Sequence, residues 1–166
     1  MGKNEVMKEN QVRADLIAKH QAVLEQAIEA VTTRKSWSPF KDSPSTKIHG
    51  TEKPVKGRAA FDARLQQRFE LDLPGITGWA GEEVSPFTQE PLGITYPLCD
   101  PEKVVDAAKA SMAQWAKTDF ELRLALCMEI ADRLYERNFE MVHSVMHVAG
   151  QSYTQSFSGS GPNALD

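Results

Sequence analysis

Several features that mark particular classes of protein are scarce in this sequence. No run of about 18 consecutive apolar residues occurs, and the polar N-terminus lacks the apolar stretch of a signal peptide, so no membrane segment is predicted. Cysteine occurs only twice, at Cys99 and Cys127. Two cysteines are too few for a disulfide framework, and these two are too far apart for a CxxC redox or zinc motif. These absences favour a protein of the reducing cytoplasm.

An excess of basic residues is also absent. The chain has 19 Lys and Arg against 23 Asp and Glu, which gives a formal net charge of −4. Both signs are interspersed, so the basic face that a nucleic-acid backbone requires is not predicted. What is present is a globular composition, with 41% hydrophobic and 25% charged residues among 166. The sequence predicts one ordinary domain with a core, and neither nucleic acid nor a membrane as partner.

Residues 1–80 are predicted to form a helical N-terminal extension. A long helix is predicted from roughly Gln11 to Arg34, because apolar residues recur there on one face. These residues are Leu16, Ile17, Leu24, Ala27, Ile28 and Val31. His20 lies on the same face, and we interpret it as a packed core histidine rather than a metal ligand, because no second ligand is near it in the sequence.

A loop is predicted between Ser36 and Pro54, because three prolines, one glycine and several Ser and Thr in this segment disfavour both an α-helix and β-sheet pairing. Trp37 and Phe40 are interpreted as anchors that hold this loop to the body, with a partner-binding patch as the alternative. A second helix is predicted from Pro54 to Leu71, although Gly57 weakens it. Its expected inward residues are Val55, Ala59, Phe61, Leu65 and Phe69.

Residues 81–166 are predicted to form a second unit, a hairpin followed by three helices. The boundary lies within Leu71–Glu83, where one proline and three glycines predict an irregular crossing. Beyond it, Val84–Phe87 and Leu92–Tyr96 are predicted to pair as short strands around Thr88–Pro91. The prolines in these segments restrict them to edge or irregular ladders.

The first two helices of this unit carry N-terminal signals. Asp100 followed by Pro101 predicts a cap and a first-turn proline for a helix that ends near Ala116. Thr118–Glu121 fits a capping box that begins the next helix, in which Cys127 is interpreted as a small core residue rather than a reactive thiol. The expected inward residues are Val104, Val105, Ala108, Met112 and Trp115 in the first helix, and Phe120, Leu124, Leu126, Ile130, Ala131 and Leu134 in the second.

The third helix contains two histidines at a spacing that metal sites use. Asn138 is predicted to cap this helix and Gly150 to end it, with Met141, Val142, Val145 and Val148 as apolar positions. His143 and His147 stand four residues apart, so two imidazoles could share one ion. Zinc usually takes three or four protein ligands, so we interpret both as partly exposed helix histidines and assign no metal site.

The last residues contain a weak phosphate-binding signal. Gly159-Ser160-Gly161 resembles part of a phosphate cradle, but no strand precedes it and the third glycine of the fingerprint is missing. Pro162 predicts the first turn of a further helix, which would end after a single turn. No catalytic, cofactor-binding or metal-binding residue is assigned in this chain.

One run of motifs resembles the aldehyde dehydrogenase family. The segment SPFTQEPLGITYP is similar to the asparagine-proline-alanine-threonine-glycine-glutamate signature near the start of these enzymes, and Gln89 replaces the usual glycine. The matching positions are Pro86, Thr88, Glu90, Leu92, Gly93 and Pro97. The similarity continues through Trp115, Ala131-Asp132-Arg133 and Gly150-Gln151.

Four shorter motifs look like the phenylacetic acid degradation branch of this family, the paaN type. They are Trp37-Ser38-Pro39, Phe69-Glu70-Leu71-Asp72, Gly81-Glu82-Glu83-Val84-Ser85-Pro86 and His147-Val148-Ala149-Gly150-Gln151. That branch carries a longer N-terminal extension than ordinary aldehyde dehydrogenases, and residues 1–80 resemble it. Together the motifs extend the resemblance over most of the chain.

The resemblance implies the N-terminal part of an α/β aldehyde dehydrogenase fold, cut before the cofactor-binding sheet. NAD or NADP is implied as cofactor of the parent enzyme, the remainder of that enzyme as partner, and a homo-oligomer as its assembly. The family places the nucleophilic cysteine and the dinucleotide loop downstream, and neither Cys99 nor Cys127 matches the nucleophile motif. We therefore expect a mostly α chain with a short β-hairpin, inactive alone. The alternative is a self-contained helical module that binds a protein through Trp37, Phe40 or the hairpin edge.

Overall fold

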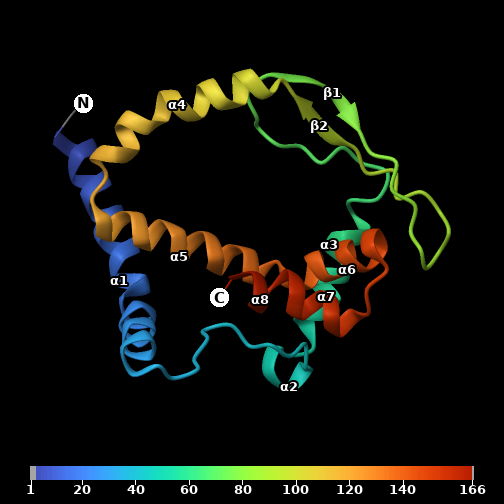
Figure 1. Cartoon of the computed structure of the whole chain (residues 1–166), viewed down its shortest axis with the longest axis horizontal. Coiled ribbons are helices and arrows are strands. Elements are labelled where there is room, and N and C mark those ends of the chain that lie inside the picture. Colours follow the sequence, from blue (N-terminus) through green and yellow to red (C-terminus); the bar gives the residue numbers. More distant parts are fainter. Residues whose placement is uncertain (1–2, 166) are drawn as a thin grey trace.

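The computed structural model describes residues 3–165, which form eight helices and one two-stranded sheet around an open frame (Figure 1). The elements are α1 (Lys3–Thr33), α2 (Thr46–His49), α3 (Glu52–Asp62), β1 (Ile76–Ala80), β2 (Tyr96–Cys99), α4 (Pro101–Lys117), α5 (Phe120–Glu136), α6 (Asn138–Ala149), α7 (Tyr153–Ser160) and α8 (Pro162–Leu165). The expected fold, mostly α with a short β-hairpin, is confirmed. Within residues 3–165 no helix is both long and apolar enough to cross a bilayer.

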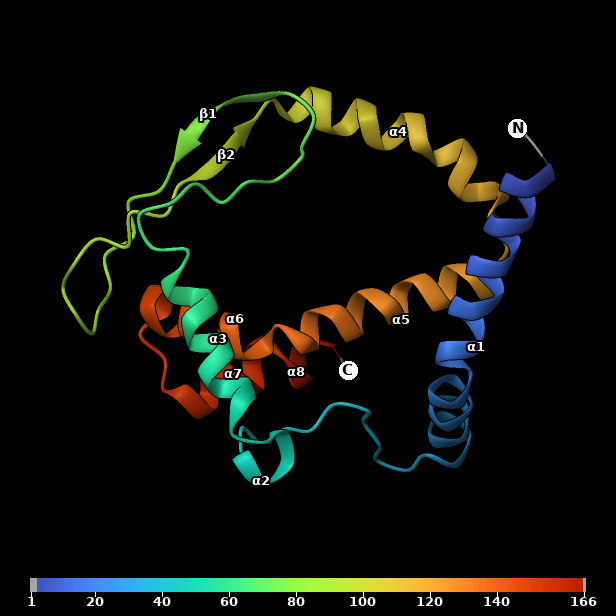
Figure 2. The same ribbon diagram turned by 180° about the vertical axis from the view of Figure 1, so that it is seen from behind.

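The frame has two long sides, one formed by the sheet and α4 and the other by α5. Figure 2 shows from behind that α4 stays apart from α5, and that α1 crosses the end of α5. At the opposite end, α3, α6 and α7 pack together around a small core. The core consists of Phe139, Val142 and Phe157, with Tyr135, Met146 and Tyr153 at its edge. A second small cluster joins Phe61 to Leu92 and Ile94.

Helix α1 begins at Lys3, eight residues before the predicted start at Gln11. Residues 3–10 contain two Lys, two Glu and one Met, and no glycine or proline, so local propensity extends the helix beyond its apolar stripe. The stripe faces α5 only in part. Its first residues are half-buried or buried, whereas Ile28 and Val31 near the end remain exposed.

Helix α3 is shorter than predicted and ends at Asp62 rather than Leu71. The chain turns through Gln66, whose φ is +59°, and the Phe69 amide then donates to the Thr95 carbonyl. Three of the predicted inward residues do face the interior, Phe61 as a buried residue and Leu65 and Phe69 packed against its cluster. The other two, Val55 and Ala59, are exposed, because α3 turns that side to solvent.

The strands lie elsewhere than the sequence predicts. Strand β1 occupies part of Leu71–Glu83, where an irregular crossing was expected, and pairs antiparallel with β2. The predicted hairpin of 84–87 with 92–96 is reduced to a single bridge between Val84 and Pro91. Proline lacks the N–H that a ladder needs, so this segment cannot extend its pairing.

Helix α5 is capped by Asp119 rather than by the predicted Thr118. The Asp119 carboxylate accepts a hydrogen bond from the Leu122 amide at 2.9 Å, whereas Thr118 ends α4 and donates its hydroxyl to the Gln114 carbonyl. Both residue types cap helices well, and the turn between α4 and α5 decides which one is used. In the same way, Asn138 is the first residue of α6 and not its cap, and its side chain is buried.

This difference predicts unequal effects of two alanine substitutions. Asp119→Ala removes the cap, and also the ion pair with Arg13, so it should lower the free energy of unfolding by about 0.5–2 kcal/mol. Thr118→Ala should change it by less than about 0.5 kcal/mol, because only a hydrogen bond back to the preceding turn is lost. Urea unfolding followed by circular dichroism measures both. An equal or larger loss of stability for Thr118→Ala would support the predicted capping box, with Thr118 as the cap of α5.

Candidate functional site

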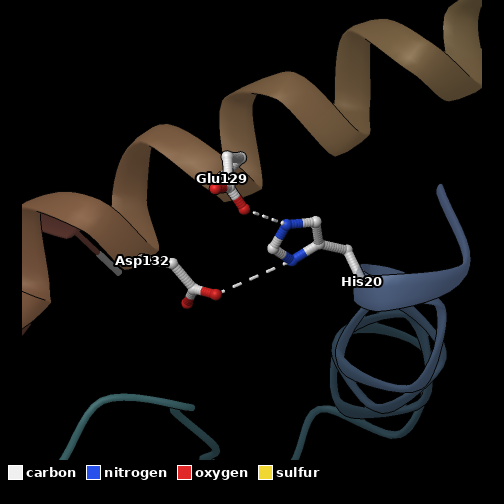
Figure 3. A group of neighbouring side chains, drawn as sticks. All are labelled: His20, Glu129 and Asp132. Carbon is white, nitrogen blue, oxygen red and sulfur yellow. Dashed lines mark hydrogen bonds and ion pairs between the residues drawn. The ribbon is translucent and has the colours of Figure 1, made fainter. Parts of the chain in front are cut away.

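A cluster of ionisable side chains joins α1 to α5 (Figure 3). His20 points from α1 toward α5 and is only 4% exposed. Its Nε2 lies 2.9 Å from Glu129 Oε2, and its Nδ1 lies 3.8 Å from Asp132 Oδ2. We call these three residues the His20 cluster. The packed histidine that the sequence predicts is confirmed, but its partners are more than a hundred residues away and were missed.

Glu129 is the centre of the charge network around this cluster. Lys19 donates to Glu129 Oε2 at 2.5 Å, and Arg133 donates to Oε1 at 2.8 Å. Hydrogen bonds from Lys19, then Arg133, then His20 lower the pKa of the Glu129 carboxyl to about 2. Asp132 lies 3.9 Å from the same Lys19 ammonium. The two carboxylates are thus offset by cations, and the network ties α1 to α5 by charge as well as by apolar contact.

The His20 cluster offers the ligand types of a metal site, and one atom of each residue lies within 4.8 Å of the others. The two carboxylates, however, face opposite ring nitrogens (Figure 3). An ion on Nδ1 would gain Asp132 as its second ligand, while Glu129 would bind the N–H on the far side of the ring. Two protein ligands are fewer than zinc sites use, and Lys19 already binds Glu129. The sequence-based prediction that this chain holds no metal stays a prediction.

Glu129→Gln should remove a contribution to stability that depends on pH. Its folded pKa of about 2 is below its ordinary value of 4.5, so the ionised form stabilises the fold. This contribution is complete above about pH 4.5 and is lost as the pH falls toward 2. The difference in unfolding free energy between wild type and Glu129→Gln should therefore be constant near neutral pH and shrink below about pH 4.5. Urea unfolding at a series of pH values measures it.

Glu25→Gln provides the control for this experiment. Glu25 is an exposed carboxylate of the same helix pair, and among the described residues it accepts one hydrogen bond, from the side-chain amide of Gln21. Its replacement should change stability little at any pH, because exposed contacts of this kind contribute little. A difference for Glu129→Gln that is independent of pH would show that the carboxylate is not held by these three donors.

The two histidines of α6 do not form a second cluster of ligands. His147 is buried rather than partly exposed, because Phe61 stacks on its ring at 4.9 Å between centroids. Ser85 Oγ accepts hydrogen bonds from the backbone amides of Phe87 and Thr88, so its hydroxyl proton is available for a hydrogen bond to His147 Nδ1. The distance from Ser85 Oγ to His147 Nδ1 is 2.8 Å. Burial, and then the charge of a nearby arginine, lower the pKa of His147, which favours the neutral ring that this bond requires.

His143 is half-buried, one turn away, and burial also lowers its pKa. Within residues 3–165, neither histidine joins a group of three ligating side chains. The hydrogen bond between Ser85 and His147 holds the loop 85–90 on α6. Because Ser85 is fully buried, it cannot reach a substrate.

The remaining candidates of the sequence analysis are placed as follows. Both cysteines are free thiols. Cys99 is half-buried in β2, and Cys127 is exposed on α5, so its assignment as a core residue is wrong for this chain. Gly159 and Gly161 lie at the end of α7 rather than between a strand and a helix, and Pro162 begins α8 as predicted.

Helix α4 presents an apolar face that nothing in the described chain covers. No residue of this helix is buried. Its predicted inward residues do share one face, but Val104, Val105, Met112 and Trp115 are exposed, and we call these four residues the apolar face of α4. On α5, the large apolar residues that are exposed are Phe120, Ile130 and Leu134. Large apolar patches of this kind mark interaction surfaces in soluble proteins.

The accessible surface of the whole chain is correspondingly large. It measures 11695 Å², for a mass of 18.5 kDa. A compact monomer of this mass exposes about 8,200 Å². The excess of roughly 3,500 Å² is several times the ~800 Å² that one partner buries in a standard protein interface.

A cleft of about 690 Å³ is lined in part by His20 and Asp132 of the His20 cluster. Its walls come from α1, the loop 34–40, α5 and the end of α8, and they include Val23, Ala27, Trp37, Phe40, Met128 and Ala131. Phe40 is buried and packs on Tyr135 with 4.9 Å between ring centroids, so its role as an anchor is confirmed. Trp37 is still one-third exposed and lines the cleft.

The comparisons with known proteins give one informative match. No family model matches the chain, and no curated protein matches it. A crystal structure of an NAD-dependent aldehyde dehydrogenase from Burkholderia multivorans is 36% identical, with a TM-score of 0.83. The match covers 90% of this chain and 27% of that one. The fold therefore corresponds to a fragment of an aldehyde dehydrogenase fold, and the chain spans about a quarter of the enzyme it resembles.

Proposed function

We propose that this chain is the N-terminal part of an aldehyde dehydrogenase that uses NAD or NADP, and that it is inactive alone. The observation that carries the proposal is the match to the Burkholderia multivorans enzyme, in sequence and in fold, over nine-tenths of the chain. The family resemblance places the nucleophilic cysteine, the activating glutamate and the dinucleotide loop outside these residues. The task of this chain in the enzyme is then structural, to support the cofactor-binding domain.

The exposed faces are the surfaces that this structural role requires. Each large apolar side chain that moves from water into a core contributes about 1.5–3 kcal/mol. The four large residues on the apolar face of α4 are 37–64% exposed, so covering them would contribute roughly 3–6 kcal/mol, a large part of the stability of a whole domain. We propose that this face and the exposed side of α5 cover the parallel sheet of the cofactor-binding domain.

The motifs at Trp37, Phe69, Gly81 and His147 support the phenylacetic acid degradation branch for the parent enzyme. Its reaction would oxidise an aldehyde to an acid or an acyl thioester. In such a reaction the cysteine thiolate of the parent enzyme would add to the carbonyl, and NAD or NADP would supply the hydride acceptor. The acyl group of the enzyme thioester would then be transferred to water or to a thiol, which frees the cysteine. We propose a cytoplasmic homo-oligomer as the form of this parent.

Association of the isolated chain tests the structural part of the proposal. The wild-type chain should self-associate in sedimentation velocity, because about 3,500 Å² of excess surface is uncovered. Met112→Glu places a charge in the apolar face of α4 and should shift the chain toward monomer at the same concentration. Ala110→Glu places the same charge about half a turn away on α4, where it should leave the association unchanged.

The alternative function predicts different behaviour in the same measurement. A self-contained interaction module would be monomeric and would melt in one sharp cooperative transition, which would contradict the proposal. Equal effects of Met112→Glu and Ala110→Glu would also contradict it, because the association would then follow net charge and not this face.

The reading frame after codon 166 tests the assignment to an enzyme. The genomic DNA should continue in frame and encode a glycine-rich dinucleotide loop followed by a nucleophilic cysteine. The product of that longer frame should reduce NAD or NADP when supplied with phenylacetaldehyde, whereas the 166-residue chain should not. A stop codon directly after Asp166 would overturn the assignment.

A further inference from the structure

The cleft between α1 and α5 is hollow because small side chains face each other there. Ala27 and Ala30 on α1 and Ala131 on α5 line it, where larger residues would close the space between the helices. Aromatic side chains of the following loop, Trp37 and Phe40, complete the apolar wall. A volume of about 690 Å³ is within the range of pockets that hold small organic molecules.

Among the described residues, one cation beside this cleft has no charged partner. Asp132, which lines the cleft, lies 3.9 Å from the ammonium of Lys19, and Glu29 lies 3.3 Å from the ammonium of Lys35. Arg34 also lines the cleft. Within the described residues, its side chain makes no hydrogen bond or ion pair. One uncompensated guanidinium thus stands beside an apolar wall.

The backbone of Arg34 adds a second observation. Its φ is +54°, in the left-handed region where glycine or asparagine usually ends a helix. The Lys35 amide still closes the last turn of α1 by donating to the Ala30 carbonyl. A left-handed arginine is costlier than glycine at such a position, and sites that retain this strain often have a function. In this conformation Arg34 is exposed and is one of the residues that line the cleft.

We propose that this cleft binds a small organic monocarboxylate with an apolar body. The body occupies the space between Ala27, Trp37 and Ala131, and the carboxylate pairs with Arg34 in the forked geometry that a guanidinium favours. A dianion such as a phosphate monoester fits less well, because Arg34 is the one cation beside the cleft without a charged partner among the described residues, and Asp132 lines the same cleft. This inference rests on the cleft alone and not on the proposed enzymatic function.

Isothermal titration of the 166-residue chain with 4-phenylbutyrate tests the proposal. The matched neutral ligand is 4-phenylbutyramide, which has the same body without the charge. The acid should bind at least about tenfold more tightly than the amide, as expected for one charge-assisted pair. Equal affinities for acid and amide would overturn the proposal, because binding would then be apolar adsorption to the exposed faces.

Three variants separate the cleft from other surfaces. Arg34→Asn keeps a residue that tolerates the left-handed backbone and removes the charge, so acid binding should weaken about tenfold while the amide is unaffected. Ala131→Leu fills the hollow and should abolish binding of both, with helix content checked by circular dichroism. Met112→Glu, on the apolar face of α4, should bind as wild type does. Unchanged acid binding by Arg34→Asn, or by a folded Ala131→Leu, would overturn the proposal.

Discussion

Replacing Phe157 by alanine should lower the free energy of unfolding by about 3–5 kcal/mol. Its side chain is fully buried in the small core of α6 and α7. The ring lies 5.1 Å from that of Phe139 and 5.4 Å from that of His49, between centroids, so it also holds α2 against the core. Because three elements meet on this ring, the vacated space cannot be refilled by a shift of one neighbour. Urea unfolding at low protein concentration, followed by circular dichroism, measures the loss.

Phe120→Ala is the matched control for this prediction. It makes the same chemical change at a residue that is 66% exposed, at the start of α5. In the isolated chain it should change stability by less than about 0.5 kcal/mol. Equal losses for the two substitutions would show that the core at Phe157 is not formed, or that Phe120 is covered by something in this chain.

The contrast between these two phenylalanines explains what the sequence could predict. Periodicity shows which side of a helix is apolar, and the predicted apolar residues of α4 and of α5 do gather on one side of each helix. It does not show whether a given chain also contains the partner of that face. Phe120 and Met112 were predicted to point inward and are exposed. Periodicity describes one helix by itself, whereas burial also requires a segment that packs against its apolar face.

Local signals succeeded where they depend on neighbours in the sequence. Asp100 caps α4 and Pro101 begins it, and Gly150 ends α6 with a φ of +71°, as predicted. Each of these positions is decided within one helical turn, so a short stretch of sequence contains the information.

Non-local contacts decided the parts that the sequence did not predict. Strand β1 exists because β2, about twenty residues later, supplies its hydrogen bonds, and a glycine-rich sequence gives little sign of such pairing. The partners of His20 are equally remote, on α5. A spacing rule for metal ligands searches within one element, so it found the histidine pair of α6 and missed the His20 cluster.

Gly57 carries the prediction with the second largest effect. A Cβ atom at this position of α3 would lie 2.4 Å from Phe139 Cβ and 2.6 Å from its backbone carbonyl carbon. The obstacle includes backbone of α6, so it cannot swing aside as a flexible side chain would, and α3 and α6 would have to separate. Gly57→Ala should therefore cost about 2–3 kcal/mol, even though alanine favours a helix by about 1 kcal/mol over glycine.

Gly159→Ala tests the same change where no contact opposes it. This glycine lies within α7, and its added Cβ would meet nothing within 4 Å. Helix propensity then acts alone, and the substitution should stabilise the chain by about 0.5–1 kcal/mol. Thermal unfolding of both variants should shift in opposite directions from wild type. Stabilisation by both substitutions would mean that α3 and α6 do not approach at Gly57. Destabilisation by both would leave that contact in place and would show that helix propensity does not decide the effect at Gly159.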